Sequence, residues 1–315
     1  MSSSRVIGSC LGREAWDWKH DFVSEGSTDP RQRATAMNRR TFLSGCAAAA
    51  LFGTAGRALA FSSGRVSVQV RGEGPDVILI PGLTNGRDVW DGTVRAVPGY
   101  RYHLVQVAGF AGEPARGNAD GAIVSGVAGE IARYIVEAGL RRPALIGHSM
   151  GGIVAMMVAA RYPARVGKVM AVDILPSPAS GFGFAGTQVA PLADALFNGL
   201  MGSPQGRSVL DALIGGFGGS GVASSRSDSA VVARATHELA RTDLTPELPR
   251  ITAPLTVVYA VPDIPADAVA VDRLYRIGYA PAHGAKLRRV AGSGHMIMYD
   301  RPQRFYAEVR DFLKG

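Results

Sequence analysis

The stretch LIGHSMGG, residues 145–152, places a serine between glycines at the point where an apolar run ends. Gly147, Ser149 and Gly151 follow the spacing G-x-S-x-G, in which a buried strand turns sharply into a helix and lifts the serine hydroxyl to the top of the sheet. Side chains at the two glycine positions would collide with neighbouring backbone, which explains why the chain accepts the entropic cost of glycine there. The sequence therefore predicts that Ser149 is a nucleophile.

Strand and helix patterns alternate on both sides of this turn. The run DVILIPG (76–82) is continuously apolar and ends in Pro-Gly, as a buried parallel strand does. We expect strands at 65–70, 76–82, 102–109, 144–149, 166–174, 255–261 and 285–292, and helices at 126–140, 151–163 and 301–315. This alternation predicts an α/β fold in which helices cover both faces of a mostly parallel sheet.

Residues 176–248 interrupt the alternation. Glycine-rich segments lie among three helical patterns there, and no strand pattern is present. The helical patterns cover residues 191–201, 206–214 and 228–242. We therefore expect a helical cap over one end of the sheet, inserted into a core formed by residues 61–175 and 249–315.

The N-terminal part of the chain differs in composition from the rest. Twin arginines at 39–40 precede a short Ala/Leu-rich stretch that closes with Ala-Leu-Ala at 58–60, a small-x-small cleavage pattern. Residues 37–60 thus resemble a twin-arginine signal peptide and predict a periplasmic or secreted protein without stable membrane insertion. Cys46 follows the arginines too closely for a lipoprotein signal, which disfavours lipidation. Residues 1–36 show no periodicity and are expected to be a disordered extension or a start-site artefact.

Composition and spacing exclude several classes of protein. The formal net charge is +8, but no arginine run is longer than two, whereas a nucleic-acid surface needs clustered charge. Cys10 and Cys46 both precede the proposed cleavage site, so the remaining chain has no disulfide framework and no thiol nucleophile. No His, Asp and Glu cluster has metal-ligand spacing. We therefore expect chemistry that uses no metal and no cofactor, and no nucleic-acid partner.

Taken together, these segments resemble the α/β-hydrolase family, in its serine esterase and lipase-like branch. Beyond GHSMGG, the resemblance rests on LIPGLTNGRDVW (79–90), DLTPELPRITAPLTVVYAVPD (243–263) and GSGHMIMYDRPQRF (292–305). It implies an eight-stranded type of sheet with the cap inserted after the sixth strand. It also implies an oxyanion hole built from the backbone N–H groups of Leu83 and Met150. Pro81-Gly82 stands where the family usually has His-Gly, but a backbone donor does not need that histidine.

The same resemblance indicates the partners of the serine. His295, in the GSGH loop after the last strand, occupies the position of the family's general base. An acid must hold the imidazole in the right tautomer, and Asp263, just after the strand 255–261, is the expected acid. Asp173 at the end of the preceding strand is the alternative position, and Asp267 is a third.

These residues predict a serine hydrolase that cleaves carboxylic esters through an acyl-enzyme. The same triad would serve a lactonase, a C–C bond hydrolase or a perhydrolase, and a non-catalytic ligand-binding member of the fold is a further alternative. The intact Ser, Asp and His set argues against the last of these. Apolar side chains of the cap favour small to medium apolar esters as substrates. The candidate substrate-contacting residues are His148, Phe182, Phe184, Leu196, Phe197, Met201 and Phe217.

Overall fold

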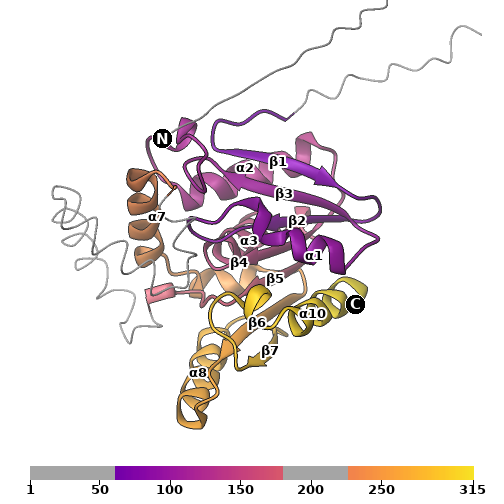
Figure 1. Cartoon of the computed structure of the whole chain (residues 1–315), viewed down its shortest axis with the longest axis vertical. Coiled ribbons are helices and arrows are strands. Elements are labelled where there is room, and N and C mark those ends of the chain that lie inside the picture. The colour runs from indigo at the N-terminus through magenta and orange to yellow at the C-terminus, as the bar shows by residue number, and fades with distance from the viewer. Residues whose placement is uncertain (1–60, 180–225) are drawn as a thin grey trace, which may run out of the picture. The chain divides into compact units, whose positions relative to one another are not determined.

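The computed structural model describes residues 61–179 and 226–315. The predicted signal peptide, the segment before it and the expected helices at 191–201 and 206–214 lie outside these residues. A seven-stranded sheet runs through the described part of the chain in the order β1-β3-β2-β4-β5-β6-β7 (Figure 1). Its strands are β1 (Val66–Arg71), β2 (Asp76–Ile80), β3 (Arg101–Val107), β4 (Ala144–His148), β5 (Lys168–Val172), β6 (Leu255–Val261) and β7 (Lys286–Ala291).

The strand directions confirm the predicted α/β class. β1 is antiparallel to β3, and the other neighbours in the sheet are parallel. Each strand lies within two residues of its expected position. In the described residues the sheet has seven strands, where the family resemblance implied eight, and the segment expected as the cap follows β5, the fifth strand of this chain.

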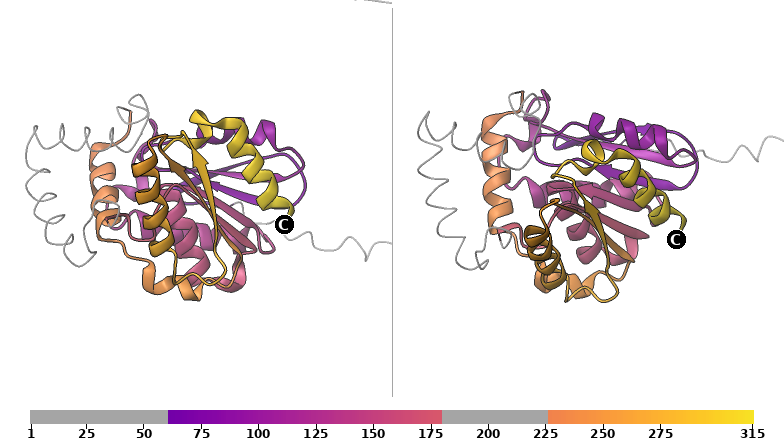
Figure 2. Two further views of the ribbon diagram at one scale, coloured as in Figure 1. Left: turned by 90° about the horizontal axis from the view of Figure 1, so that it is seen from below. Right: turned by 60° about the horizontal axis from the view of Figure 1, so that its bottom comes forward.

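Helices lie on both faces of this sheet (Figure 2). An apolar core fills the space between the helices and the sheet on each face. Side chains of β2 alternate between the two cores, because Ile78 and Ile80 enter one core while Val77 and Leu79 enter the other. The first core packs under α2 (Val124–Glu137), α3 (Met150–Arg161), α7 (Ser229–Arg241) and α8 (Pro265–Gly278). The second packs under α1 (Asp91–Ala96), α9 (Ile297–Asp300) and α10 (Pro302–Lys314). Short 3-10 helices lie at Arg87–Trp90, Arg116–Asn118, Pro163–Arg165 and Thr245–Arg250.

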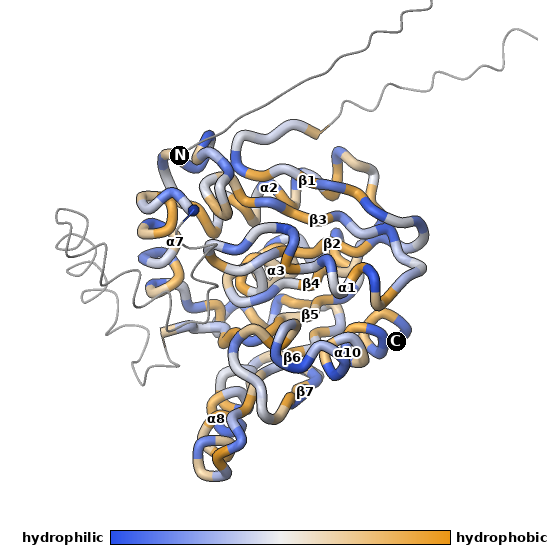
Figure 3. The backbone as a smooth tube through the Cα atoms, in the orientation of Figure 1, coloured by the Kyte–Doolittle hydropathy of each residue, from blue (hydrophilic) through white to orange (hydrophobic). Residues whose placement is uncertain are grey.

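Helix α3, which begins directly after Ser149, is the most buried helix among the residues that the structure describes. Every residue from Met150 to Ala160 is buried. A helix that is apolar on all sides belongs in a protein interior. Apolar colour accordingly runs along the central strands, while α7, α8 and α10 alternate between apolar and polar colour (Figure 3). The turn at Ser149 is therefore fixed between two buried elements.

The last element of the expected cap, predicted at 228–242, is α7. Asp228 caps its N-terminus, since its Oδ1 accepts from the backbone N–H groups of Ala230 and Val231 at 3.0 Å each. Val231, Val232 and Ala235 are buried in the same core as α2 and α3. This helix thus packs on the body of the fold.

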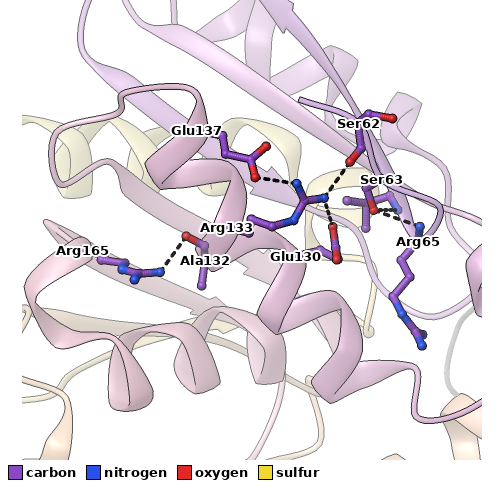
Figure 4. Close-up of polar contacts among 9 residues, drawn as sticks. Ser62, Ser63, Arg65, Glu130, Ala132, Arg133, Glu137 and Arg165 are labelled. Atoms are coloured by element: carbon purple, nitrogen blue, oxygen red, sulfur yellow. Dashed lines mark hydrogen bonds and ion pairs between the residues drawn. The ribbon is translucent and has the colours of Figure 1, made fainter. Parts of the chain in front are cut away.

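The start of the described chain is tied to the middle of α2 (Figure 4). Arg133 donates to the carbonyl oxygen of Ser62 at 2.7 Å and to Glu130 and Glu137 at 2.6 and 2.7 Å. Its guanidinium also lies 4.6 Å from the centre of the Phe61 ring, which packs edge-on against Tyr134. Residues from Phe61 onward are therefore anchored to the fold.

Candidate active site

Ser149 is the single residue between the end of β4 and the start of α3. Its φ is +53°, in the left-handed region that a side chain makes unfavourable, as a strained nucleophile turn requires. Its backbone N–H donates to the carbonyl oxygen of Val172 on β5 at 2.8 Å, which secures the turn to the neighbouring strand. A Cβ atom at Gly147 would overlap the backbone of Gly151, and one at Gly151 would overlap the backbone of Ile80. The predicted reason for the two glycines is confirmed.

The loop after β2 passes beside this turn. A Cβ atom built on Gly82 would lie 3.2 Å from the Cβ atom of Ser149. The loop is closed by a hydrogen bond from the backbone N–H of Asn85 to the carbonyl oxygen of Gly82 at 3.2 Å. Within residues 61–179 and 226–315, the backbone N–H groups of Leu83 and Met150 donate to no protein acceptor. Both predicted oxyanion donors are thus free to bind a substrate oxygen.

His295 lies at the same turn, in the loop between β7 and α9. Its ring centre is 4.6 Å from the ring centre of His148, the residue next to Ser149. Among the described residues, Ser149 Oγ makes no hydrogen bond, so His295 lies near the serine turn without a hydrogen bond to the serine hydroxyl. Catalytic hydrogen bonds are often long before substrate binds and shorten in the complex.

The residue that holds His295 is Asp173, directly after β5. His295 Nδ1 lies 2.7 Å from Asp173 Oδ2, and the two side chains are only 20% and 12% exposed. The expectation that Asp263 lies against the imidazole is wrong. Its side chain is 76% exposed and its ion-pair partner is Arg301, at 3.9 Å. Asp267, the third candidate, is exposed in the first turn of α8.

Neighbouring strands explain why Asp173 is the residue that reaches His295. The order β4-β5-β6 puts the end of β5 directly beside the serine turn, whereas Asp263 follows β6, one strand further away. Asp173 has a φ of +51°, and its backbone N–H donates to the carbonyl oxygen of Val258 at 2.7 Å. The strand end therefore bends so that the carboxylate points toward the loop of His295.

Two further groups hold the other oxygen of this carboxylate. Asp173 Oδ1 accepts from the backbone N–H of Ala260 at 2.8 Å and from the hydroxyl of Tyr275 at 3.1 Å. Tyr275 belongs to α8, a helix that the sequence analysis did not predict. Pro265 at its first position, with alanines at 266, 268 and 270, is the signal that could have identified it.

His148, expected among the substrate-contacting residues, has a completely buried side chain. Its Nε2 donates to the carbonyl oxygen of His295 at 2.9 Å. Burial, with a contribution from nearby His295, lowers the pKa of His148 to about 3. The ring is therefore neutral at ordinary pH, with the proton on Nε2, and its Nδ1 has no partner in the described part of the chain.

The remaining candidate residues, Phe182, Phe184, Leu196, Phe197, Met201 and Phe217, lie outside the described residues. Among the residues that are described, no group of three or more His, Cys, Asp and Glu side chains is placed to hold a metal ion. In the same residues, no helix is long and apolar enough to cross a membrane.

Comparison with known proteins supports the relationship that the motifs indicate. A family model described as "Alpha/beta hydrolase family" matches residues 77–309. Among curated proteins, the chain is similar to a pimeloyl-[acyl-carrier protein] methyl ester esterase of Aeromonas hydrophila, with 35% identity over 112 residues. That match covers 35% of this chain and 42% of the relative. The corresponding protein of Nitrosospira multiformis is 32% identical over 123 residues, which are 36% of this chain and 44% of the relative. The chain therefore spans less than half the length of these relatives.

Solved structures of similar fold include two esterases. An esterase from Exiguobacterium antarcticum superposes with a TM-score of 0.61 at 19% identity, over 79% of this chain and 96% of that one. A thermophilic esterase from Thermogutta terrifontis gives a TM-score of 0.62 at 18% identity, over 79% and 93% of the two chains. At these identities the likeness concerns the fold.

Proposed function

The chain belongs to the alpha/beta hydrolase family, and we propose that it hydrolyses carboxylic esters through an acyl-enzyme formed on Ser149. One observation carries the proposal. A histidine held by a largely buried carboxylate lies beside a strained serine turn: His295 Nδ1 is 2.7 Å from Asp173 Oδ2, and its ring is 4.6 Å from that of His148. A non-catalytic binding protein has no need of this arrangement.

Each residue has a definite part in the proposed reaction. Ser149 Oγ attacks the ester carbonyl carbon while His295 Nε2 takes the hydroxyl proton, and His295 then returns that proton to the leaving alcohol. A water molecule, deprotonated by the same imidazole, attacks the acyl-enzyme and releases the acid. Asp173 orients the imidazole and stabilises its positive charge. The backbone N–H groups of Leu83 and Met150 bind the oxyanion, where one donor contributes about 3 kcal/mol in measured cases.

Substrates of small to medium size with an apolar acyl part are proposed from the composition of the segment 176–248. Phe and Leu side chains are frequent there, and an apolar acyl site gains about 0.8 kcal/mol for each methylene that it buries. The curated relatives are named for hydrolysis of a methyl ester. Methyl esters of such acids are therefore included among the proposed substrates.

A panel of p-nitrophenyl esters from acetyl to palmitoyl tests this function, without added metal or cofactor. We expect kcat/KM to rise from acetyl to an optimum at short or medium chains and then to fall, because the cavity enclosed by a small cap is limited. A methyl ester, a lactone and a vinylogous diketone complete the panel. If no ester is hydrolysed but the lactone or the diketone is turned over, the lactonase or C–C hydrolase alternative replaces the esterase proposal.

Ser149→Ala is the matched control for the reaction itself. A fluorophosphonate should label the native protein once per chain and leave the variant unlabelled. Turnover should fall by about a millionfold, the scale measured when a triad serine is removed elsewhere. Equal labelling of both proteins would exclude Ser149 as the nucleophile.

We also propose that the protein is exported. The twin arginines at 39–40 and the Ala-Leu-Ala sequence at 58–60 support this. Phe61, the residue after that sequence, packs against Tyr134 with ring centres 4.8 Å apart, so cleavage there would leave the described fold whole.

A further inference from the structure

Two tyrosines one turn apart, Tyr275 of helix α8 and Tyr279 at its C-cap, hold the loop that carries Asp173. The hydroxyl of Tyr275 donates to Asp173 Oδ1 at 3.1 Å. The hydroxyl of Tyr279 donates to the carbonyl oxygen of Ile174, the next residue of that loop, at 2.6 Å. Side chains four residues apart lie on the same face of a helix. This face of α8 therefore contacts two successive residues at the end of β5.

The ring of Tyr275 is fixed between two other aromatic rings. Tyr259 on β6 stacks against it with ring centres 4.2 Å apart, and Tyr279 lies nearly parallel to it at 6.2 Å. The hydroxyl of Tyr259 points to a different carboxylate, Asp272 Oδ1, at 2.9 Å. Burial, reinforced by the negative charge of Asp173, raises the pKa of Tyr275 well above its usual range. Tyr275 thus remains a protonated donor at any pH at which the protein functions.

The two oxygens of Asp173 are consequently used for different purposes. Oδ1 is occupied by the N–H of Ala260 and the hydroxyl of Tyr275, and Oδ2 faces Nδ1 of His295. On the basis of the triad proposed above, we propose that Tyr275 is a positioning residue, whose hydroxyl fixes the Asp173 carboxylate and withdraws part of its negative charge from His295.

This arrangement has an electrostatic consequence for the reaction. A hydrogen bond to a carboxylate stabilises its charge and weakens its attraction for a neighbouring cation. Without the Tyr275 hydroxyl, more of the charge of Asp173 acts on the imidazolium, so His295 holds its proton more strongly. The groups packed around this pair are Tyr275 from α8, Tyr279 at the C-cap of that helix, Tyr259 and the N–H of Ala260 from β6, and the neutral His148 from β4.

Tyr275→Phe tests the proposal because it removes only the hydroxyl and keeps the stacked ring. We expect kcat/KM for the best ester to fall about tenfold, the scale of one hydrogen bond to a charged group. We also expect the acidic limb of the kcat/KM against pH profile to move to higher pH. Tyr259→Phe is the matched control, since it removes a hydroxyl from the same stack that does not reach Asp173. In Tyr259→Phe the acidic limb of the kcat/KM profile should not move.

Replacement of Tyr275 by 3,5-difluorotyrosine provides a second variant that keeps the hydroxyl and the ring. Its phenol is more acidic and donates more strongly, so the limb should move to lower pH, opposite to the shift in Tyr275→Phe. An unchanged limb in both variants overturns the proposal, even if activity falls, because a purely structural role predicts no shift. If Tyr275→Phe fails to fold, the fluorinated protein decides alone.

The variant Asp173→Asn separates failure of this inference from failure of the proposed function. In that background Tyr275→Phe should have little further effect, because the carboxylate through which it acts is absent. If Asp173→Asn retains native activity, the triad itself is misassigned. If Asp173→Asn is inactive and the limb in Tyr275→Phe stays in place, the triad holds and only the role of Tyr275 is wrong.

Discussion

His148 Nε2 lies 2.9 Å from the carbonyl oxygen of His295, and the two imidazole rings lie 4.6 Å apart. The residue next to the serine thus holds the loop of His295 by a direct hydrogen bond. The carbonyl oxygen can only accept, so His148 must carry its proton on Nε2. A second proton on Nδ1 would charge a ring that is completely buried.

This geometry predicts how stability depends on pH. The pKa of His148 is lowered to about 3 in the fold by burial, against about 6.5 in the unfolded chain. Below pH 6.5 His148 is protonated in the unfolded chain but stays neutral in the fold. Its contribution to the free energy of unfolding is therefore complete above pH 6.5 and declines as the pH falls. The free energy of unfolding should lose about 1.4 kcal/mol per pH unit through this group. Urea unfolding between pH 7.5 and 4.5 measures the slope.

His148→Gln isolates this contribution, because glutamine can still donate to the His295 carbonyl but does not titrate. The free energy of unfolding of the native protein, relative to that of the variant, should fall by about 2–3 kcal/mol from pH 6.5 to 4.5. His103, whose pKa burial also lowers, is present in both proteins and contributes equally. Parallel curves for the native protein and His148→Gln would contradict the prediction.

Glu238 of α7 should contribute strongly to stability, because it caps the start of α2. Its Oε2 accepts from the backbone N–H groups of Ile123 and Val124 at 2.7 and 2.8 Å. Its Oε1 accepts from the N–H and hydroxyl of Ser125 at 2.9 and 2.7 Å. A carboxylate at a helix N-terminus satisfies otherwise unpaired donors and opposes the helix dipole.

Glu238→Gln should therefore lower the free energy of unfolding by about 1.5–3 kcal/mol, measured by urea denaturation at pH 7. Glu137→Gln serves as the comparison, since Glu137 forms a surface pair with Arg133 on the same helix. Such pairs contribute about 0.3–0.5 kcal/mol. Equal losses in the two variants would show that Glu238 is no more than another surface charge.

The elbow and the sheet could be predicted from the sequence because their signals are local. Gly147 and Gly151 are required by backbone contacts within a few residues of Ser149 or on the adjacent strand, and the apolar runs mark the strands directly. The histidine follows from its loop after β7. In each case the chain order and the sheet edge determine the position.

The acid could not be chosen in the same way, because it depends on the order of strands in space. Asp173 and Asp263 both follow a strand that ends at the same edge of the sheet. Only the arrangement β4-β5-β6 and the bend at Asp173, with φ of +51°, decide which one meets His295. The contact of Tyr275 with Asp173 is even harder to predict from the sequence, since it depends on how α8 packs against the end of β5.

Export predicts a defined mature N-terminus. Protein recovered from a host with a twin-arginine export system should begin at Phe61 or within a few residues of it, as read by intact mass and terminal sequencing. Replacement of the arginines at 39–40 by lysines should retain the longer chain inside the cell. Recovery of the native chain only from the cytosol, beginning near Met1 or Met37, would contradict export.

The two aspartates give the sharpest test of the triad. In Asp173→Asn the side-chain amide can donate its N–H to His295 Nδ1. The imidazole proton then moves to Nε2, which is the wrong tautomer for a base. By analogy with measured triads, kcat should fall by about 10⁴-fold. Asp263→Asn should change kcat little, because its carboxylate is 76% exposed and its ion-pair partner is Arg301. Both proteins should fold, as judged by far-UV circular dichroism and melting temperature. A crippled Asp263→Asn beside a nearly native Asp173→Asn would restore the position expected from the family pattern and would require the loop of His295 to move toward β6 during catalysis.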